Sequence, residues 1–259
     1  MLEKVESTLD ELGLHTMSEL LSSQCEQSLA KEHSYLEFLE ALLTEEIEER
    51  KRRSFEIRMK TASFPFKKTL DEFDFSWAKG VDRRVITELA GLGFIHSATN
   101  VCLLGPPGVG KTHLSVGLGI EAIVGGNVVY FTTMAKMANE LGGLNSLRRA
   151  RKYLSPKVLI IDEIGYRPID AKAAVHFFEI VSERYESGSI ICSSNKGFQE
   201  WGSLFGDSVL ATAILDRLLH HAVVMNIKGD SYRLKDRKRQ GIASHLEVAQ
   251  AYEKGATIE

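Results

Sequence analysis

The stretch that decides the fold is LLGPPGVGKTHLS, residues 103–115. An apolar run stops at Gly105, and a loop rich in proline and glycine leads into an amphipathic stretch that opens on Lys111 and Thr112. This loop fits the pattern G-x-x-x-x-G-K-[ST], whose glycines let the backbone curl so that successive N–H groups point at phosphate oxygens. The N-terminus of the following helix adds the positive end of its dipole. The stretch therefore predicts a strand, a phosphate-binding loop and a helix, in that order.

The loop and the first turn of the predicted helix form a candidate nucleotide site. We expect Lys111 to reach the β and γ phosphates and Thr112 to hold Mg²⁺ through its hydroxyl. The predicted nucleotide-binding residues are Gly105, Pro106, Gly108, Val109, Gly110, Lys111, Thr112 and His113.

Strands and helices alternate around this loop. Short apolar runs occupy residues 101–105, 127–132, 158–163, 189–195 and 222–227, and stretches of helical periodicity separate them. Strands that are almost continuously apolar indicate a parallel sheet covered on both faces. We therefore expect the α/β class, with a five-stranded parallel sheet and helices on both of its faces.

The 259 residues divide into four parts by composition. Residues 1–63 read as a small helical domain, because leucines recur at helical spacing and proline is absent. Residues 64–97 are an aromatic connector that we expect to pack on the next domain. Residues 98–240 form the nucleotide-binding core, and residues 241–259 are a tail without a strong signal.

Composition also limits the classes of function. The net charge of -3 gives no reason to expect a polyanionic partner. Binding to a polyanion such as DNA would therefore depend on local basic clusters. Three widely spaced cysteines predict reduced thiols, because they offer neither a disulfide framework nor a zinc spacing. The acidic N-terminus is unlike a signal peptide, and no apolar run approaches the roughly 20 residues that span a bilayer. We expect a cytoplasmic protein with no membrane partner.

A pair of carboxylates follows the third predicted strand, in VLIIDEIG. Asp162 ends the apolar run, where it can reach the Mg²⁺ shell. Glu163 stands just outside the sheet, where a carboxylate can polarise an attacking water, so Glu163 is the candidate general base. The pair favours hydrolysis of ATP over a switch-type GTPase. A guanine-reading N-K-x-D motif is also lacking, because Phe198 stands where its aspartate would be.

Two further polar residues follow in chain order. Asn195 ends the next strand, and ligands of such sheets sit beyond the carboxyl ends of the strands, where an amide can position the water. Arg217 lies on a later helix and has two possible uses. It could pair with a carboxylate of its own fold, or project toward the γ phosphate of a neighbouring subunit. Taken alone, the residues favour the structural use.

These residues resemble a known family. GPPGVGKTHLS, LIIDEIG, SSNKGF and AILDRLLHH are similar to AAA+ ATPases of the initiator and helicase-loader clade, and more narrowly to IstB-like helper ATPases of insertion sequences. The similarity is dense from Phe64 to Lys235. It implies ATP-dependent oligomerisation with the site at a subunit interface, which makes Arg217 the arginine finger. It also implies binding of duplex DNA without sequence preference, and a partner transposase that the helper regulates.

The resemblance adds finer expectations. Phe73 and Phe75 would border the adenine. Too few residues follow the last strand for the helical lid that most AAA+ proteins carry, and Arg233 is the nearest candidate for a second, cis-acting arginine. The alternative within the clade is a replicative helicase loader, whose N-terminal domain reads a different protein. A metabolic P-loop kinase is disfavoured by the short tail and by the Asp162–Glu163 pair.

Two basic clusters are candidates for contact with DNA phosphates. The first lies between Arg50 and Lys60 and includes Arg52 and Arg53. The second, LRRARKYLSPK, lies where an inserted helix touches nucleic acid in this clade, and carries Arg148, Arg149, Arg151 and Lys152. Such contacts give salt-sensitive affinity without reading sequence. A solvated helix face is the alternative for each cluster. The pair His220–His221 gives no metal site, because no other ligand set is near it in sequence.

Overall fold

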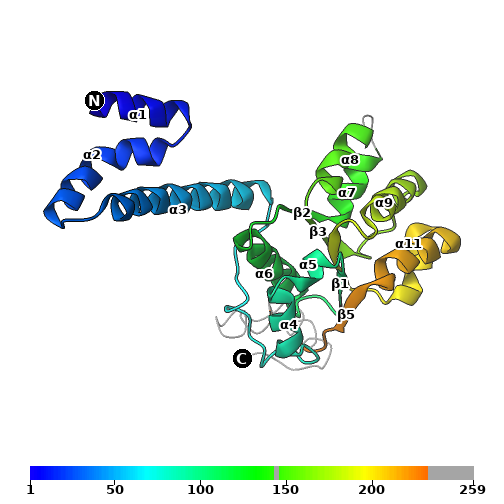
Figure 1. Cartoon of the computed structure of the whole chain (residues 1–259). Coiled ribbons are helices and arrows are strands. Elements are labelled where there is room, and N and C mark those ends of the chain that lie inside the picture. Colours follow the sequence, from blue (N-terminus) through cyan, green and yellow to red (C-terminus); the bar gives the residue numbers. More distant parts are fainter. Residues whose placement is uncertain (143–145, 233–259) are drawn as a thin grey trace, which may run out of the picture. The chain divides into compact units, whose positions relative to one another are not determined.

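The structure is a computed structural model that describes residues 1–142 and 146–232, with the backbone alone described for residues 146–149. The chain forms two compact units that divide between Lys60 and Thr61, whereas the sequence predicts the boundary after residue 63 (Figure 1). The predicted tail, Arg233 and the question of a C-terminal lid all fall outside the described residues. No helix within the described ranges is both long and apolar enough to cross a bilayer.

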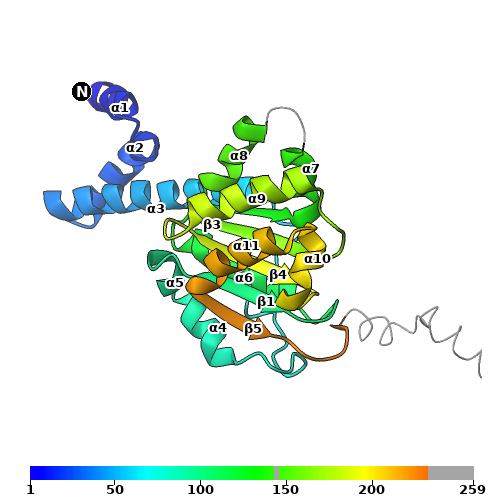
Figure 2. The same cartoon turned by 90° about the vertical axis from the view of Figure 1, so that its right-hand side faces the viewer.

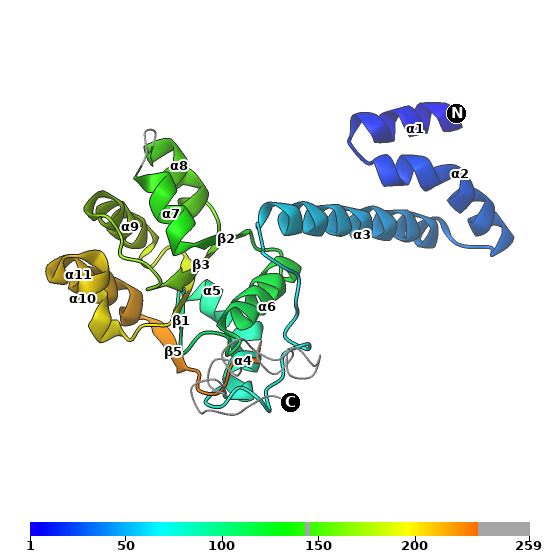
Figure 3. The same ribbon diagram turned by 180° about the vertical axis from the view of Figure 1, so that it is seen from behind.

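The N-terminal unit consists of three helices, α1 (Leu2–Glu11), α2 (His15–Ala30) and α3 (Tyr35–Thr61), as Figure 3 shows. Its small core holds Met17 and Leu21 of α2 against Leu42 of α3.

A buried carboxylate fastens α3 to the first two helices. Glu46 accepts the backbone N–H of Met17 at 3.1 Å and the Nε–H of Arg50 at 2.6 Å. Arg50 also donates to the carbonyl of Gly13, in the turn between α1 and α2, at 2.7 Å. These polar bonds supplement the small apolar core of the unit.

The second unit is built on the predicted sheet. Its strands are β1 (Asn100–Leu104), β2 (Val129–Thr133), β3 (Val158–Ile164), β4 (Ser189–Ser194) and β5 (Ala222–Asn226). They lie in the order β2-β3-β4-β1-β5, and every pairing is parallel. Nearly every residue of β1, β3 and β4 is buried, which is why these strands read as continuous apolar runs. The prediction of a five-stranded parallel sheet is confirmed.

Helices cover both faces of this sheet (Figure 1, Figure 2). On one face lie α4 (Arg83–Ala90), α5 (Gly93–His96) and α6 (Lys111–Val124). On the other lie α7 (Met134–Leu141), α8 (Ser146–Leu154), α9 (Ala171–Arg184), α10 (Trp201–Phe205) and α11 (Ser208–His220). The predicted helices on both faces are therefore confirmed.

The N-terminus of α6 differs from those of α7, α9 and α11. Thr133, Asp170 and Asp207 each cap a helix by accepting a backbone N–H of its first turn. Helix α6 instead begins after Gly110, which has no side chain to accept these hydrogen bonds. The first N–H groups of α6 can therefore meet a ligand, at the helix end whose dipole favours an anion.

Candidate functional site

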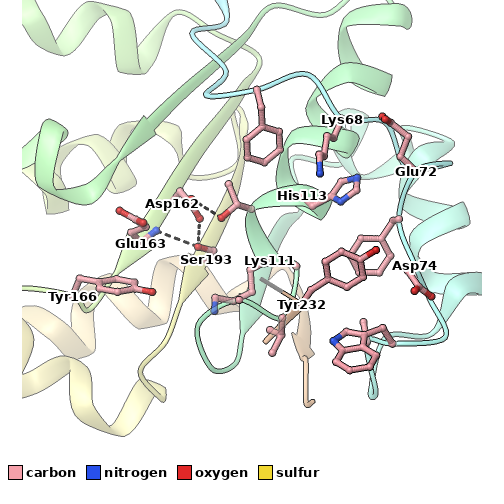
Figure 4. A pocket seen from close by; sticks show the side chains of 18 residues that line it. Lys68, Glu72, Asp74, Lys111, His113, Asp162, Glu163, Tyr166, Ser193 and Tyr232 are labelled. Atoms are coloured by element: carbon pink, nitrogen blue, oxygen red, sulfur yellow. Dashed lines mark hydrogen bonds between the residues drawn. The ribbon is translucent and has the colours of Figure 1, made fainter. Parts of the chain in front are cut away.

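A cavity opens at the N-terminus of α6, beside the carboxyl ends of β1, β3 and β4 (Figure 4). Its walls come from the phosphate-binding loop and α6, from the connector, from the ends of β3 and β4, and from the chain after β5. The lining includes Phe73, Trp77, Gly108, Lys111, Thr112, His113, Asp162, Glu163, Ser193 and Tyr232. Segments far apart in sequence thus converge on the predicted nucleotide loop.

The phosphate-binding loop has the curled backbone, with positive φ angles at glycine, that its sequence predicts. Gly105 and Gly110 have φ values of +147° and +103°, and a Cβ at Gly110 would lie 2.6 Å from the ring of Phe73. The Nζ of Lys111 donates to the carbonyl oxygens of Gly105 and Pro106 at 2.6 and 2.8 Å. The lysine is therefore held over the curled loop, with its charge at the cavity.

The connector closes over the first turn of α6. The Nε2 of His113 lies 2.8 Å from the carbonyl of Thr69, and the ring of Phe73 meets the imidazole edge-on at 5.2 Å between centroids. Burial lowers the pKa of His113, which favours the neutral ring that donates Nε2–H to Thr69. Of the two predicted adenine neighbours, Phe73 lines the cavity, whereas Phe75 packs behind it at 4.9 Å.

The predicted magnesium ligands lie side by side on the opposite wall. The hydroxyl of Thr112 donates to Oδ2 of Asp162 at 2.8 Å, although the two residues are far apart in sequence. Asp162 is only 3% exposed, and its other oxygen accepts a hydrogen bond from Ser193. Glu163 lies next to it at the cavity edge and donates its backbone N–H to Ser193 (Figure 4).

Asn195 lies just beyond β4 and is not among the cavity residues. The backbone N–H of Gly105 donates to the carbonyl of Ser194 at 3.1 Å, so the end of β4 adjoins the loop. The Oδ1 atom of Asn195 is buried and has no hydrogen-bond partner in the part of the chain that the structure describes. It offers an acceptor beside the site, and its predicted task remains a prediction.

Arg217 is not brought to the cavity of its own chain. Its guanidinium donates to the carbonyl of Ala213 at 3.1 Å and lies 4.7 Å from the ring centre of Phe178. Within residues 1–142 and 150–232, no ion pair joins Arg217 to a carboxylate. The carboxylate partner that the structural use requires is therefore not found among these residues.

Arg52 and Arg53 of the first basic cluster have carboxylate partners on their own helix. Arg52 and Arg53 both bond to Glu49 at 2.7 Å, and Arg52 also bonds to Glu56 at 2.6 Å. The hydrogen bonds from Arg52 and Arg53 lower the pKa of Glu49 to about 2. Carboxylates thus balance part of the charge that was expected to meet DNA.

The second basic cluster lies on α8 and is only partly available. Lys152 pairs with Glu140 of α7 and lies over the rings of Tyr130 and Tyr153, so it holds α8 to the core. Arg151 is exposed. The side chains of Arg148 and Arg149 lie outside the described residues.

Two aromatic residues that reach the site, Trp77 and Tyr232, belong to no sequence motif. The indole N–H of Trp77 donates to the carbonyl of Asp230 at 2.9 Å, and the backbone N–H of Tyr232 donates to the carbonyl of Gly108 at 3.0 Å. These bonds link the connector, the chain after β5 and the loop. Only the fold brings these segments together, so no local pattern could have found them.

One sequence inference needs correction. The fold brings Glu186 to the pair His220–His221, so a third metal-binding side chain does lie near it, and the three ligand atoms fall within 4.8 Å of one another. All three residues are exposed, and His220 also hydrogen-bonds Tyr185 at 2.7 Å. Sequence spacing missed Glu186 because it precedes β4, whereas the histidines precede β5.

Comparison with known proteins gives the family. Residues 7–240 match the family model described as IstB-like ATP binding protein. The chain is 47% identical over 245 residues to the insertion sequence IS21 ATP-binding protein of Pseudomonas aeruginosa, covering 93% of this chain and 92% of that protein. It is 44% identical over 246 residues to the IS5376 ATP-binding protein of Geobacillus stearothermophilus, covering 93% and 97%.

Solved structures share the fold of the second unit. The crystal structure of the DnaC helicase loader superposes with a TM-score of 0.51 at 20% identity, over 63% of this chain and 98% of that one. The similarity to the helicase loader is limited to the fold. The insertion-sequence proteins, in contrast, match nearly the whole length of this chain. The chain therefore belongs to the family of IstB-like ATP-binding proteins, and it shares the fold of the helicase loader DnaC.

Proposed function

We propose that the protein is an Mg²⁺-dependent ATPase that assembles on duplex DNA, hydrolyses ATP at subunit interfaces and controls the transposase of its insertion sequence. The observation that carries the proposal is the convergence of Thr112, Asp162 and Glu163 opposite Lys111, across a single cavity. This arrangement combines a phosphate cradle, a pair of oxygen ligands and a carboxylate near the position of a γ phosphate.

The oxygen ligands suit magnesium. A hydroxyl and a buried carboxylate oxygen, 2.8 Å apart, are the hard donors that Mg²⁺ takes beside substrate phosphates. When bound, Mg²⁺ neutralises charge on the phosphate oxygens. Thr112 and Asp162 would hold it, and Lys111 would add a second positive charge from the loop.

Hydrolysis needs a base at the attacking water. Glu163 accepts a proton from the water as the water oxygen attacks the γ phosphorus. The bond from that phosphorus to the bridging oxygen breaks, and ADP leaves with the electron pair. Asn195 follows β4, whose end adjoins the phosphate-binding loop, and its amide is the candidate group that positions this water.

Phosphate release and particle size test this function together. We expect the wild-type chain to release phosphate from Mg²⁺-ATP, faster with duplex DNA, and to elute as a large assembly only when ATP and DNA are both present. Lys111→Ala removes a charged hydrogen-bond donor, so its ATP affinity should fall at least about tenfold. A wild-type chain that stays monomeric with both ligands, or that hydrolyses no ATP, would overturn the proposal.

Arg217 does not line the cavity of its own chain and pairs with no carboxylate among the described residues, so it is suited to act on a neighbouring subunit. We expect Arg217→Ala to lower the maximal hydrolysis rate about a hundredfold while each subunit still binds ATP, because a fixed charge near the transferred phosphoryl group is lost. Mixing Arg217→Ala with Lys111→Ala subunits should restore part of the rate, since one supplies an intact loop and the other an intact arginine. If no ratio of the two restores activity, the action in trans is wrong.

The DNA and transposase parts of the proposal rest on family membership and on α8. The relatives are named as proteins of insertion sequences, so a transposase of the same element is the expected partner. On α8, Arg151 is exposed, and Arg148 and Arg149 share its sequence cluster. No observation favours the helicase-loader alternative, because the likeness to a loader is confined to the fold.

A further inference from the structure

Two consecutive carboxylates at one site pose a geometric problem. Successive side chains of a regular strand point to opposite faces of the sheet. A regular β3 would therefore turn Asp162 toward the magnesium position and Glu163 away from it. Both nevertheless line the same cavity (Figure 4).

A bulge in β3 solves this problem. Ile161 pairs with Cys192 of β4, but the next paired residues are Ile164 and Ser194. Two residues of β3 thus oppose the single residue Ser193, which defines a bulge. The second of them, Glu163, has a φ of +62°, in the left-handed region that residues with a side chain rarely adopt. Such a conformation persists only where its surroundings enforce it.

One hydroxyl enforces it here. The residue inserted by a bulge loses its partner in the backbone ladder. The N–H of Glu163 is satisfied by Oγ of Ser193 at 3.1 Å. The same hydroxyl donates its proton to Oδ1 of Asp162, whose other oxygen is taken by Thr112. Since Ser193 is 1% exposed, water has little room to replace this hydroxyl.

The next residue of β4 holds the far side of the bulge. The hydroxyl of Ser194 donates to the carbonyl of Ile164 at 2.7 Å. Ser193 differs from Ser194 because it alone contacts both carboxylate-bearing residues. Strand β4 therefore contributes two hydroxyl groups that hold the β3 bulge, in addition to leading into Asn195.

We propose that Ser193 is a positioning residue for ATP hydrolysis, which pins the β3 bulge and so presents Glu163 to the attacking water. This inference rests on the proposed ATPase function. Loss of the hydroxyl leaves a buried N–H unsatisfied and lets the strand relax toward regular pairing, which turns Glu163 away from the cavity. Loss of the Ser193 hydroxyl should therefore lower the rate of hydrolysis but not the affinity for nucleotide, because Lys111 and the phosphate-binding loop still bind nucleotide.

Steady-state hydrolysis and analogue binding test the inference on the full chain. We expect Ser193→Ala to lower kcat about 10- to 100-fold, in the range for residues that orient a site through another group. Its affinity for a non-hydrolysable ATP analogue should stay within about threefold of wild type. Ser193→Thr keeps the hydroxyl and should restore kcat to within about threefold of wild type.

A matched control lies on the same strand. Ser189 is also buried, and its hydroxyl donates to the carbonyl of Phe94 at 3.0 Å, at the opposite end of β4. Ser189→Ala loses a comparable hydrogen bond and should leave kcat unchanged. Ser193→Ala combined with Glu163→Gln should hydrolyse no more slowly in single turnover than Glu163→Gln alone, because both changes act through one carboxylate.

Each outcome separates the two proposals. If the wild-type chain hydrolyses ATP and Ser193→Ala keeps pace with it, Ser193 has no positioning function although the ATPase stands. The inference also fails if Ser193→Thr is as slow as Ser193→Ala, if Ser189→Ala is equally slow, or if the double variant is slower than Glu163→Gln. A wild-type chain that releases no phosphate overturns the proposed function and this inference with it.

Discussion

Glu163→Gln is expected to bind ATP and assemble like the wild-type chain, yet to hydrolyse ATP about a thousandfold more slowly. General-base catalysis contributes roughly 10²- to 10⁴-fold, and glutamine keeps the shape of the side chain but cannot accept the proton of the water. The Ser193 hydrogen bond to the backbone of residue 163 does not depend on this side chain. The bulge should therefore persist, and the loss should fall on kcat alone.

Single-turnover release of labelled phosphate, beside analogue binding and size-exclusion chromatography, measures the three properties separately. Glu183→Gln is the matched control, because Glu183 is an exposed carboxylate of α9 that does not line the cavity. A Glu163→Gln chain that turns over at near wild-type rate would assign the base elsewhere. A chain that neither binds nor assembles would mean that Glu163 acts in binding.

The sequence predicted the parts of the site that lie within one motif. Lys111 and Thr112 follow from a local pattern whose backbone requires glycine, and Asp162 follows from the end of an apolar strand. Their meeting in space was predictable as well, because the carboxyl ends of parallel strands share one edge of a sheet.

The rest of the site depends on contacts that no local pattern records. In the sequence, Ser193 is a small residue in a predicted buried strand. Its function becomes apparent only from the β3 bulge that lies beside it in the structure. Lys152 reads as part of a basic cluster until Glu140 and two rings are found around it. Trp77 and Tyr232 belong to segments that adjoin only in the fold. Pairing across long stretches of chain is set by tertiary packing, which overrides local tendency.

The largest effect on stability is expected from Arg184, which lies outside the phosphate-binding loop. Arg184 of α9 is 2% exposed, and its guanidinium donates to five backbone carbonyls at 2.8–3.3 Å, those of Tyr153, Leu154, Pro156, Lys157 and Ser189. Burial lowers its pKa to about 10, which still leaves it charged at pH 7. One side chain thus joins the end of α8 and the loop before β3 to the start of β4.

Arg184→Met fills much of the same space but donates no hydrogen bond, so the five carbonyls lose this buried partner. Unsatisfied buried groups cost about 1–3 kcal/mol each, and partial relaxation limits the sum, so we expect a loss of about 4 kcal/mol in the free energy of unfolding. Urea denaturation followed by circular dichroism measures it. Arg184→Lys keeps the charge with fewer donors and should lose about half as much.

Arg84→Met, at an exposed position of α4, is the control and should change the free energy of unfolding by less than about 0.5 kcal/mol. Because Arg184 joins the beginnings of β3 and β4, its loss should also loosen the register that carries Asp162 and Ser193 at their other ends. We therefore expect Arg184→Met to lower kcat even at temperatures where it remains folded. An Arg184→Met chain as stable as Arg84→Met would mean that the carbonyls find other donors, and that the two strands keep their register without the arginine.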